Sequence, residues 1–208
     1  MKHLKTLGLA VAALALLAFA AAGTASATEL YKLTAPNPSD TLGVGTEIEM
    51  SLSAGTSMTW KHTYEGKPVA TAETCVNGGT KFKLEKAGGG EGVHPSGKVT
   101  GLSLIPCSDK IAVLKPGEME IQHIPGTTNG SVISKEAETT IYSTVFGLSC
   151  VVSTGSGTKT GTLTGATSST GHATFDIEAT IPFGICGTVF LTSSHRVTSP
   201  TGLVVEGS

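Results

Sequence analysis

Alternation of apolar and polar residues with a period of two is the feature that most limits the fold of this chain. It is clearest over residues 174–182, where apolar Phe175, Ile177, Ala179 and Ile181 alternate with Asp176, Glu178 and Thr180. The same pattern runs over residues 47–53 and 118–122. Successive side chains of a strand point to opposite faces of a sheet, so each segment predicts a strand with one buried and one solvated face. No stretch after residue 27 sustains a helical period, which predicts an all-β fold.

Turn signals separate the predicted strands. Asn129-Gly130 lies between Ile124 and Val132 and predicts a hairpin. Lys115-Pro116-Gly117 and Gly155-Ser156-Gly157 are further turn sequences. Many short strands, each with one polar face, favour an antiparallel β-sandwich or an open barrel.

The first 27 residues have the three parts of a secretory signal peptide. Lys2 and Lys5 precede an apolar run over residues 7–22, and Ala25-Ser26-Ala27 gives a small-residue cleavage pattern. The run is shorter than the ~20 strongly apolar residues that a membrane span needs. We therefore expect cleavage before Thr28, no stable membrane span, and a secreted, extracellular or envelope-associated protein.

The rest of the chain is expected to form one domain. Residues 28–44 are interpreted as a lead-in segment, in which Leu30, Tyr31 and Leu33 form a short strand before Pro36 and Pro38 interrupt any ladder. Residues 45–208 are then a single β domain, a usual length for one hydrophobic core.

Four cysteines follow the predicted cleavage site, namely Cys75, Cys107, Cys150 and Cys186. An even number in an exported chain predicts two disulfides. The sequential pairing, Cys75–Cys107 with Cys150–Cys186, is preferred because each pair brackets a strand–turn–strand unit, and the two crossed pairings are the alternatives. No Cys-x-x-Cys is present to indicate zinc or redox chemistry.

The charge of the chain argues against a nucleic-acid partner. Removal of Lys2 and Lys5 with the signal changes the formal charge from −2 to −4. Arg196 is the only arginine, whereas phosphate recognition relies on basic patches rich in arginine.

No catalytic, cofactor or metal-binding residues can be assigned from motifs. Residues 92–99 nearly match a phosphate-binding loop, but Val99 stands where a hydroxyl must hold magnesium. The paired carboxylates are interpreted as solvated strand faces, with calcium binding as the main functional alternative; they are Glu47/Glu49, Glu118/Glu120, Glu136/Glu138 and Asp176/Glu178. The histidines show no metal-binding spacing, so no cofactor is expected.

Trp60 and Tyr64 are the one candidate ligand surface. They are four residues apart, which places both rings on one face of an unbroken strand. Two rings on one face suit stacking on a sugar, and the alternative is that both belong to the core.

Several stretches of the chain resemble a family of small secreted Gly/Thr-rich β proteins of soil actinobacteria. They include residues 43–59, 113–129, 145–150, 161–165 and 197–206, with sequences such as Val-Phe-Gly-Leu-Ser-Cys and Val-Thr-Ser-Pro-Thr-Gly-Leu-Val-Val-Glu. The family has no assigned activity, so the resemblance implies secretion and a β fold and transfers no site residues.

Taken together, the sequence predicts a non-catalytic secreted or envelope-associated protein acting as a surface, matrix or binding module. One alternative is a module that binds a carbohydrate or another small ligand. The other is a secreted hydrolase whose site has no recognisable motif. The partner expected for the preferred interpretation is an envelope or matrix component, or a second copy of the chain.

Overall fold

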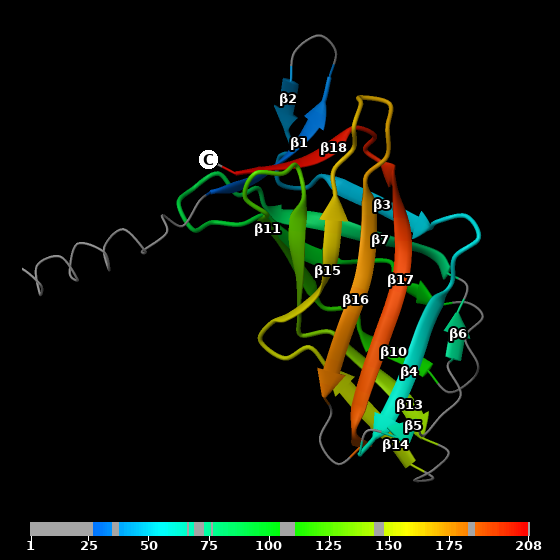
Figure 1. Cartoon of the computed structure of the whole chain (residues 1–208). Coiled ribbons are helices and arrows are strands. Elements are labelled where there is room, and N and C mark those ends of the chain that lie inside the picture. Colours follow the sequence, from blue (N-terminus) through cyan, green and yellow to red (C-terminus); the bar gives the residue numbers. More distant parts are fainter. Residues whose placement is uncertain are drawn as a thin grey trace, which may run out of the picture.

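The computed structural model describes residues 27–34, 38–65, 67–68, 73–75, 77–104, 111–143, 148–182 and 186–207 (Figure 1). The regular structure within these ranges consists of β-strands, apart from a 3₁₀ turn at Cys186. This confirms the prediction of an all-β fold.

Eight strands form a closed antiparallel barrel. They are β3 (Glu47–Leu52), β7 (Asn77–Lys86), β8 (Ser96–Val99), β11 (Glu118–His123), β12 (Gly130–Lys135), β15 (Thr158–Thr164), β16 (Thr174–Pro182) and β17 (Thr188–Ser199). Their order in space is β16-β15-β12-β11-β8-β7-β3-β17, and pairing of β16 with β17 closes the ring. The prediction of a sandwich or an open barrel therefore needs correction, because β17 pairs through both edges and leaves the ring without a gap.

The barrel has an up-and-down order, since strands that follow one another along the chain are also neighbours in space. Further strands are inserted between barrel strands. These are β4 (Met58–Tyr64), β5 (Lys67–Pro68) and β6 (Glu73–Cys75) after β3, β9 (Ser103–Leu104) and β10 (Ile111–Lys115) after β8, and β13 (Glu138–Ser143) and β14 (Leu148–Ser153) after β12.

The two halves of strand β17 pair with different neighbours. Its second half, from His195, pairs with β3 inside the barrel, whereas its first half, Thr188–Thr192, pairs with β4. The strands β16, β17 and β4 therefore extend beyond the barrel, where β10, β13 and β14 form a separate sheet (Figure 1). Side chains from these extended strands and from the separate sheet, including Trp60, Ile141 and Val189, form a second hydrophobic core between them.

A three-stranded sheet lies at the other end of the barrel. It consists of β1 (Thr28–Leu33) between β18 (Leu203–Gly207) and β2 (Pro38–Thr41). The strand over Leu30 was expected, and Leu30 and Leu42, both within the segment interpreted as a lead-in, are buried in the barrel core. Pro38 does not interrupt the ladder either. It begins the edge strand β2, where its missing N–H is tolerated.

The period-two pattern places the expected side chains inside. Ile48, Met119, Ile121 and Phe175 are buried in the barrel core, while their polar neighbour Asp176 is exposed. The hairpin predicted at Asn129-Gly130 also forms, as β11 pairs with β12 from His123↔Gly130 onward. Alternation therefore identified the inward faces of these strands correctly.

Candidate functional site

A cavity of ≈ 120 Å³ lies where the barrel core meets the second core. Met50 and Phe175 reach it from the barrel core, and Met58 and Ile181 reach it from the second core. The strands β16, β17 and β4 pass from one core to the other, so the hollow follows from the extension of these strands beyond the barrel.

The wall of the cavity is mostly apolar. Its larger apolar contributors are Met50, Met58, Val99, Met119, Phe175 and Ile181. None of the described lining residues is Asp, Glu, Lys or Arg. A wall of this kind favours apolar, uncharged matter over ions.

Hydroxyl groups line part of the same wall, and hydrogen bonds hold several of them. Thr154 Oγ1 accepts a hydrogen bond from the backbone N–H of Ala137 at 3.0 Å, and the Ser134 hydroxyl donates to Thr154 Oγ1 at 3.4 Å. The hydroxyl of Thr160 donates to the carbonyl of Val132 at 3.4 Å. These groups are largely committed to the protein.

Trp60 is the exception among the polar lining groups. Its side chain is 8 % exposed, and its buried Nε1–H meets no acceptor among the described residues. An indole N–H can only donate a hydrogen bond. Trp60 therefore carries a buried donor for which the described residues supply no acceptor.

His195 is the only titratable side chain of the described lining. Burial lowers its pKa from the ordinary value, and it outweighs the opposing effects of the Asp176 charge and of a hydrogen bond to the backbone of Phe175. The imidazole is therefore neutral at pH 7. Its ring lies against the Phe175 ring, with the two centroids 6.1 Å apart.

The cavity approaches the surface beside the start of β13. Pro116 is exposed, and Ala137 and Thr139 are half-buried, yet all three belong to the lining. These residues bring part of the lining close to the surface.

The two aromatic residues singled out from sequence do not form an exposed platform. Trp60 is buried in the second core, and Tyr64, four residues further along β4, is only half-buried. Trp60 thus packs in the interior, and its position beside a cavity was not anticipated.

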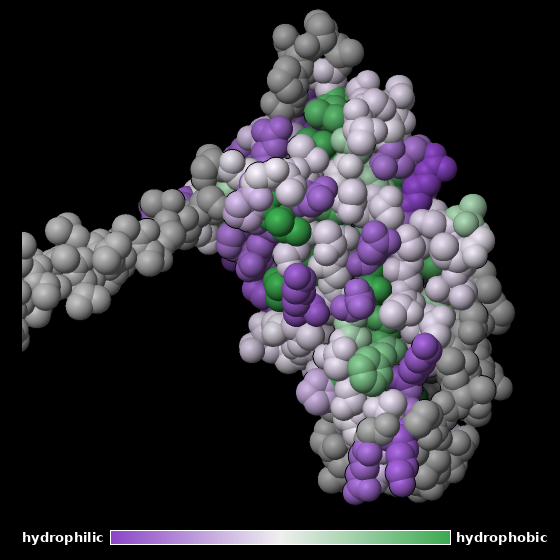
Figure 2. Space-filling model, viewed as in Figure 1, coloured by the Kyte–Doolittle hydropathy of each residue, from purple (hydrophilic) through white to green (hydrophobic). Residues whose placement is uncertain are grey.

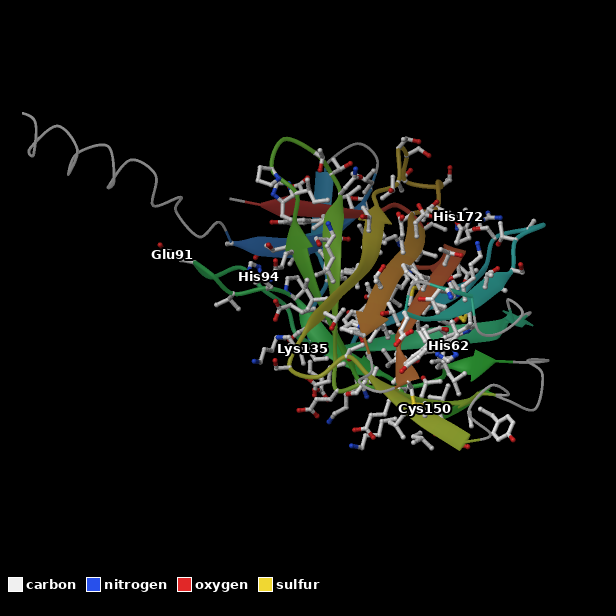
Figure 3. All side chains as sticks on the ribbon, turned by 60° about the horizontal axis from the view of Figure 1, so that its bottom comes forward. His62, Glu91, His94, Lys135, Cys150 and His172 are labelled. Atoms are coloured by element: carbon white, nitrogen blue, oxygen red, sulfur yellow. A yellow bond between two sulfur atoms is a disulfide. The ribbon has the colours of Figure 1, made fainter. Side chains whose placement is uncertain are left out.

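A disulfide ties the separate sheet to β17. Cys150 on β14 bonds to Cys186, just before β17, with the two Cα atoms 6.4 Å apart. This confirms one half of the predicted pairing. Cys107 lies outside the described residues, so the Cys75–Cys107 bridge stays a prediction. His62 Nε2–H donates to the carbonyl of Cys186, and Figure 3 shows His62 and Cys150 on the same side of the molecule.

The remaining histidines have structural partners and do not gather. His94 contacts the Thr28 hydroxyl at 3.0 Å, while His123 and His172 bond to backbone carbonyls at 2.7 Å. Figure 3 shows His62, His94 and His172 well apart. Within the described ranges, no group of three or more His, Cys, Asp or Glu side chains could hold a metal ion.

The carboxylate pairs behave as strand surfaces. Lys81 Nζ lies 2.6 Å from Glu49 and Lys135 Nζ lies 2.6 Å from Glu120. Partial burial alone would raise the pKa of Glu120, but hydrogen bonds from Lys135 and Gln122 hold it below its ordinary value. The visible face of the molecule is largely polar, with small separate hydrophobic areas (Figure 2). These ion pairs give no support to a calcium site or to paired acid–base chemistry at the carboxylates.

The near match to a phosphate-binding loop has the wrong local structure. Residues 96–99 form strand β8, whereas a phosphate-binding loop must lead into a helix. The expectation from Val99 that nucleotide binding is excluded is consistent with this geometry.

The described residues contain no helix with the length and apolar character needed to cross a bilayer. The Cys150–Cys186 disulfide is compatible with an oxidising, extracellular location.

The fold and the cavity define a class of protein, an eight-stranded up-and-down barrel with a mostly apolar interior cavity. Barrels of eight strands are just wide enough either to be filled by side chains or to hold one small ligand. Comparison with protein-family models, curated proteins and solved structures found no match to this chain. The resemblance to secreted actinobacterial proteins accordingly stays a prediction.

Proposed function

We propose that this protein is an exported, non-catalytic binding protein whose cavity takes one small, uncharged and mostly apolar molecule. The observation that carries the proposal is the ≈ 120 Å³ hollow at the junction of the two cores. This interpretation develops the small-ligand alternative raised by the sequence and moves the site from the surface to the interior.

The volume of the cavity supports a ligand of about one ring. One water needs only about 10–15 Å³ of such a cavity, and an apolar cavity of roughly 150 Å³ in another protein takes benzene. A well-packed core leaves few voids larger than a water. The hollow in this protein is therefore large for a packing defect and suitable for a small organic molecule.

The chemistry of the lining supports binding rather than turnover. His195 is the one lining side chain able to exchange a proton near neutral pH, and it has no carboxylate beside it in the described lining. A general acid–base mechanism normally uses a positioned pair of such groups. A neutral, apolar wall favours retention of an uncharged ligand.

Export is supported by the signal pattern that ends at Ala27 and by the disulfide between Cys150 and Cys186. A carrier that works outside the cell needs a fold that survives without chaperones. A closed barrel without free edges and a covalent tie both serve that need.

Trp60 makes the proposal simple to test, because it is the only tryptophan of the chain and it lines the cavity. The mature protein is titrated with toluene while the tryptophan fluorescence is recorded. We expect a saturable change that fits one site. A linear, non-saturating response up to the solubility limit of toluene would contradict the proposal.

A pair of matched variants separates the cavity from the surface. Ala137→Leu adds bulk to the cavity wall, whereas Ala112→Leu places the same side chain on an exposed position of β10 in the adjoining sheet. We expect Ala137→Leu to weaken toluene binding at least about tenfold without loss of the fold, and Ala112→Leu to bind as the native protein does. Equal binding by both variants would place the toluene elsewhere.

A further inference from the structure

The sheets outside the barrel have edges, and one of these edges carries a further inference. A strand at a sheet edge presents unpaired N–H and C=O groups, which can pair with another chain. Proteins usually protect such an edge with a proline, a charged side chain, a bulge, a very short strand or a covering loop. Among the described edges, that of β14 is the one that has none of these protections.

Prolines or charged residues occupy four of the other described edges. The strand β10 is protected twice, because its register against β13 also shifts between Val113 and Lys115. The four edges and their residues are β2 with Pro38 and Asp40, β5 with Lys67 and Pro68, β6 with Glu73, and β10 with Lys115.

The two remaining described edges are protected by length or by cover. The strand β9 has only two residues. Along the edge of β18 that faces away from β1, the N–H of Val205 donates to the carbonyl of Thr128 at 3.1 Å. The carbonyl of Leu203 on the same edge accepts from the N–H of Ala166 at 2.8 Å. Loop residues therefore already use the hydrogen-bonding groups of this edge.

The strand β14 differs from all of these. Its sequence, Leu-Ser-Cys-Val-Val-Ser, contains no proline and no charged residue. It pairs with β13 without a register shift from Glu138↔Ser153 to Ser143↔Leu148, so no bulge interrupts it. Its other edge has no partner strand among the described residues, and the strand lies at the lower rim of the molecule in Figure 1 and Figure 3.

Apolar side chains are exposed beside this edge. Cys150 and Val152 are buried on the inward face of β14, whereas Val151 between them faces outward and is 52 % exposed. Tyr142, on the neighbouring strand β13, is 41 % exposed. A partner strand that pairs with β14 can therefore also cover apolar surface.

We propose that β14 pairs antiparallel with β14 of a second copy of this chain, about a twofold axis, and so joins the two separate sheets into one continuous sheet. In such a pair the same surface of both copies meets, and each strand offers the donors and acceptors that the other needs. The chain is acidic overall, but β14 is uncharged, so the pairing places no like charges opposite each other. This inference is independent of the ligand cavity.

Sedimentation equilibrium of the mature, disulfide-bonded protein tests the assembly. We expect a monomer–dimer equilibrium with a dissociation constant on the order of micromolar, because pairing of one edge buries less surface than a standard interface. A monomer mass at every concentration up to millimolar would overturn the proposal. Growth beyond the dimer would also overturn it, because a twofold contact closes at two copies.

Two lysine variants of the same sheet test the location. Val151→Lys adds a charge to each β14, and lysine is a residue that natural edge strands use against pairing. We expect its dissociation constant to rise at least about tenfold. Ala112→Lys adds the same charge at an exposed position of β10 and should dimerise as the native protein does. Ser149→Lys, at another exposed position of β14, replaces Val151→Lys if that variant fails to fold.

Hydrogen exchange measured by mass spectrometry identifies the paired strand directly. Amides of residues 148–153 should exchange more slowly at concentrations where the dimer dominates, while those of residues 111–115 should not change. A dimer that persists undiminished in Val151→Lys, or one that leaves the exchange of residues 148–153 unchanged, would use another surface and overturn the proposal. Equal weakening by Val151→Lys and Ala112→Lys would likewise assign the effect to overall charge and not to the β14 edge.

Discussion

Trp60 on β4 lies directly opposite Leu191 on β17, and both side chains line the same cavity. The pair stands where β17 has left β3 and pairs with β4 instead. The cavity thus lies at the junction between the barrel core and the second core. Changes to either residue should alter the volume of the cavity.

Leu191→Ala should enlarge the cavity. We expect a loss of about 2 kcal/mol in the free energy of unfolding, because buried methyl groups are removed and the walls relax only in part. The variant should also admit naphthalene, detected by Trp60 fluorescence. Thr192→Ala, on the exposed face of the same strand, should cost less than about 1 kcal/mol. Urea unfolding measures both, and equal losses would indicate that Leu191 does not pack into the interior.

Gly161→Ala should damage the closure of the barrel. A Cβ at Gly161 would lie 2.1 Å from the carbonyl oxygen of Asp176 on the neighbouring strand β16. That oxygen belongs to the backbone and cannot move away cheaply, so we expect a loss of about 3 kcal/mol or more. Gly43→Ala meets nothing within 4 Å and serves as the control. Thermal unfolding of both variants is the measurement, and a stable Gly161→Ala protein would contradict the β15–β16 pairing.

The disulfide should contribute measurably to stability. Cys150 and Cys186 are separated by 36 residues, and a loop of that size predicts about 3–4 kcal/mol in the chain-entropy model. Cys150→Ser and Cys186→Ser should therefore lose similar amounts in urea unfolding. Clearly unequal losses would show that one cysteine has a role beyond the bridge.

Peptide mapping without reduction tests the second bridge. We expect a Cys75–Cys107 peptide beside the Cys150–Cys186 peptide. Recovery of a peptide that joins Cys75 to Cys150 or to Cys186 would contradict the sequential pairing.

Acid should weaken the fold through His195. Burial lowers its pKa in the folded protein, whereas the unfolded chain takes up a proton near pH ~6.5. Below that pH the unfolded state binds more protons, so the free energy of unfolding falls as the pH decreases, until the folded pKa is passed. Urea unfolding between pH 7 and 5 should show this slope, and His195→Gln should reduce it. An unchanged slope in the variant would assign the effect to other groups.

Local patterns were sufficient to predict the strands and their inward faces. Phe175 and Asp176 fall on opposite sides of β16 because alternation is a property of the strand itself. Cys150–Cys186 was also within reach, since a compact strand–turn–strand layout brings its ends together. The closure of the barrel was not, because it depends on β17 meeting β3 from almost the other end of the domain.

The cavity could not be predicted from the sequence, for a different reason. It results from how the volumes of Met50, Trp60 and Phe175 fail to fill the space between two cores, and no short pattern encodes that shortfall. One available signal concerned Trp60. Met58, Trp60 and His62 alternate with polar Thr59, Lys61 and Thr63, which already places the indole on the inward face of β4 and argues against an exposed sugar platform.

The most direct test of a ligand-binding interior is a crystal structure of the mature protein under xenon pressure. Xenon enters apolar cavities of this size without needing any specific contact. We predict an anomalous peak in the cavity between Trp60 and Leu191, which should disappear in Ala137→Leu. A crystal in which side chains fill that space, and in which xenon leaves no peak beside Trp60, would contradict the account.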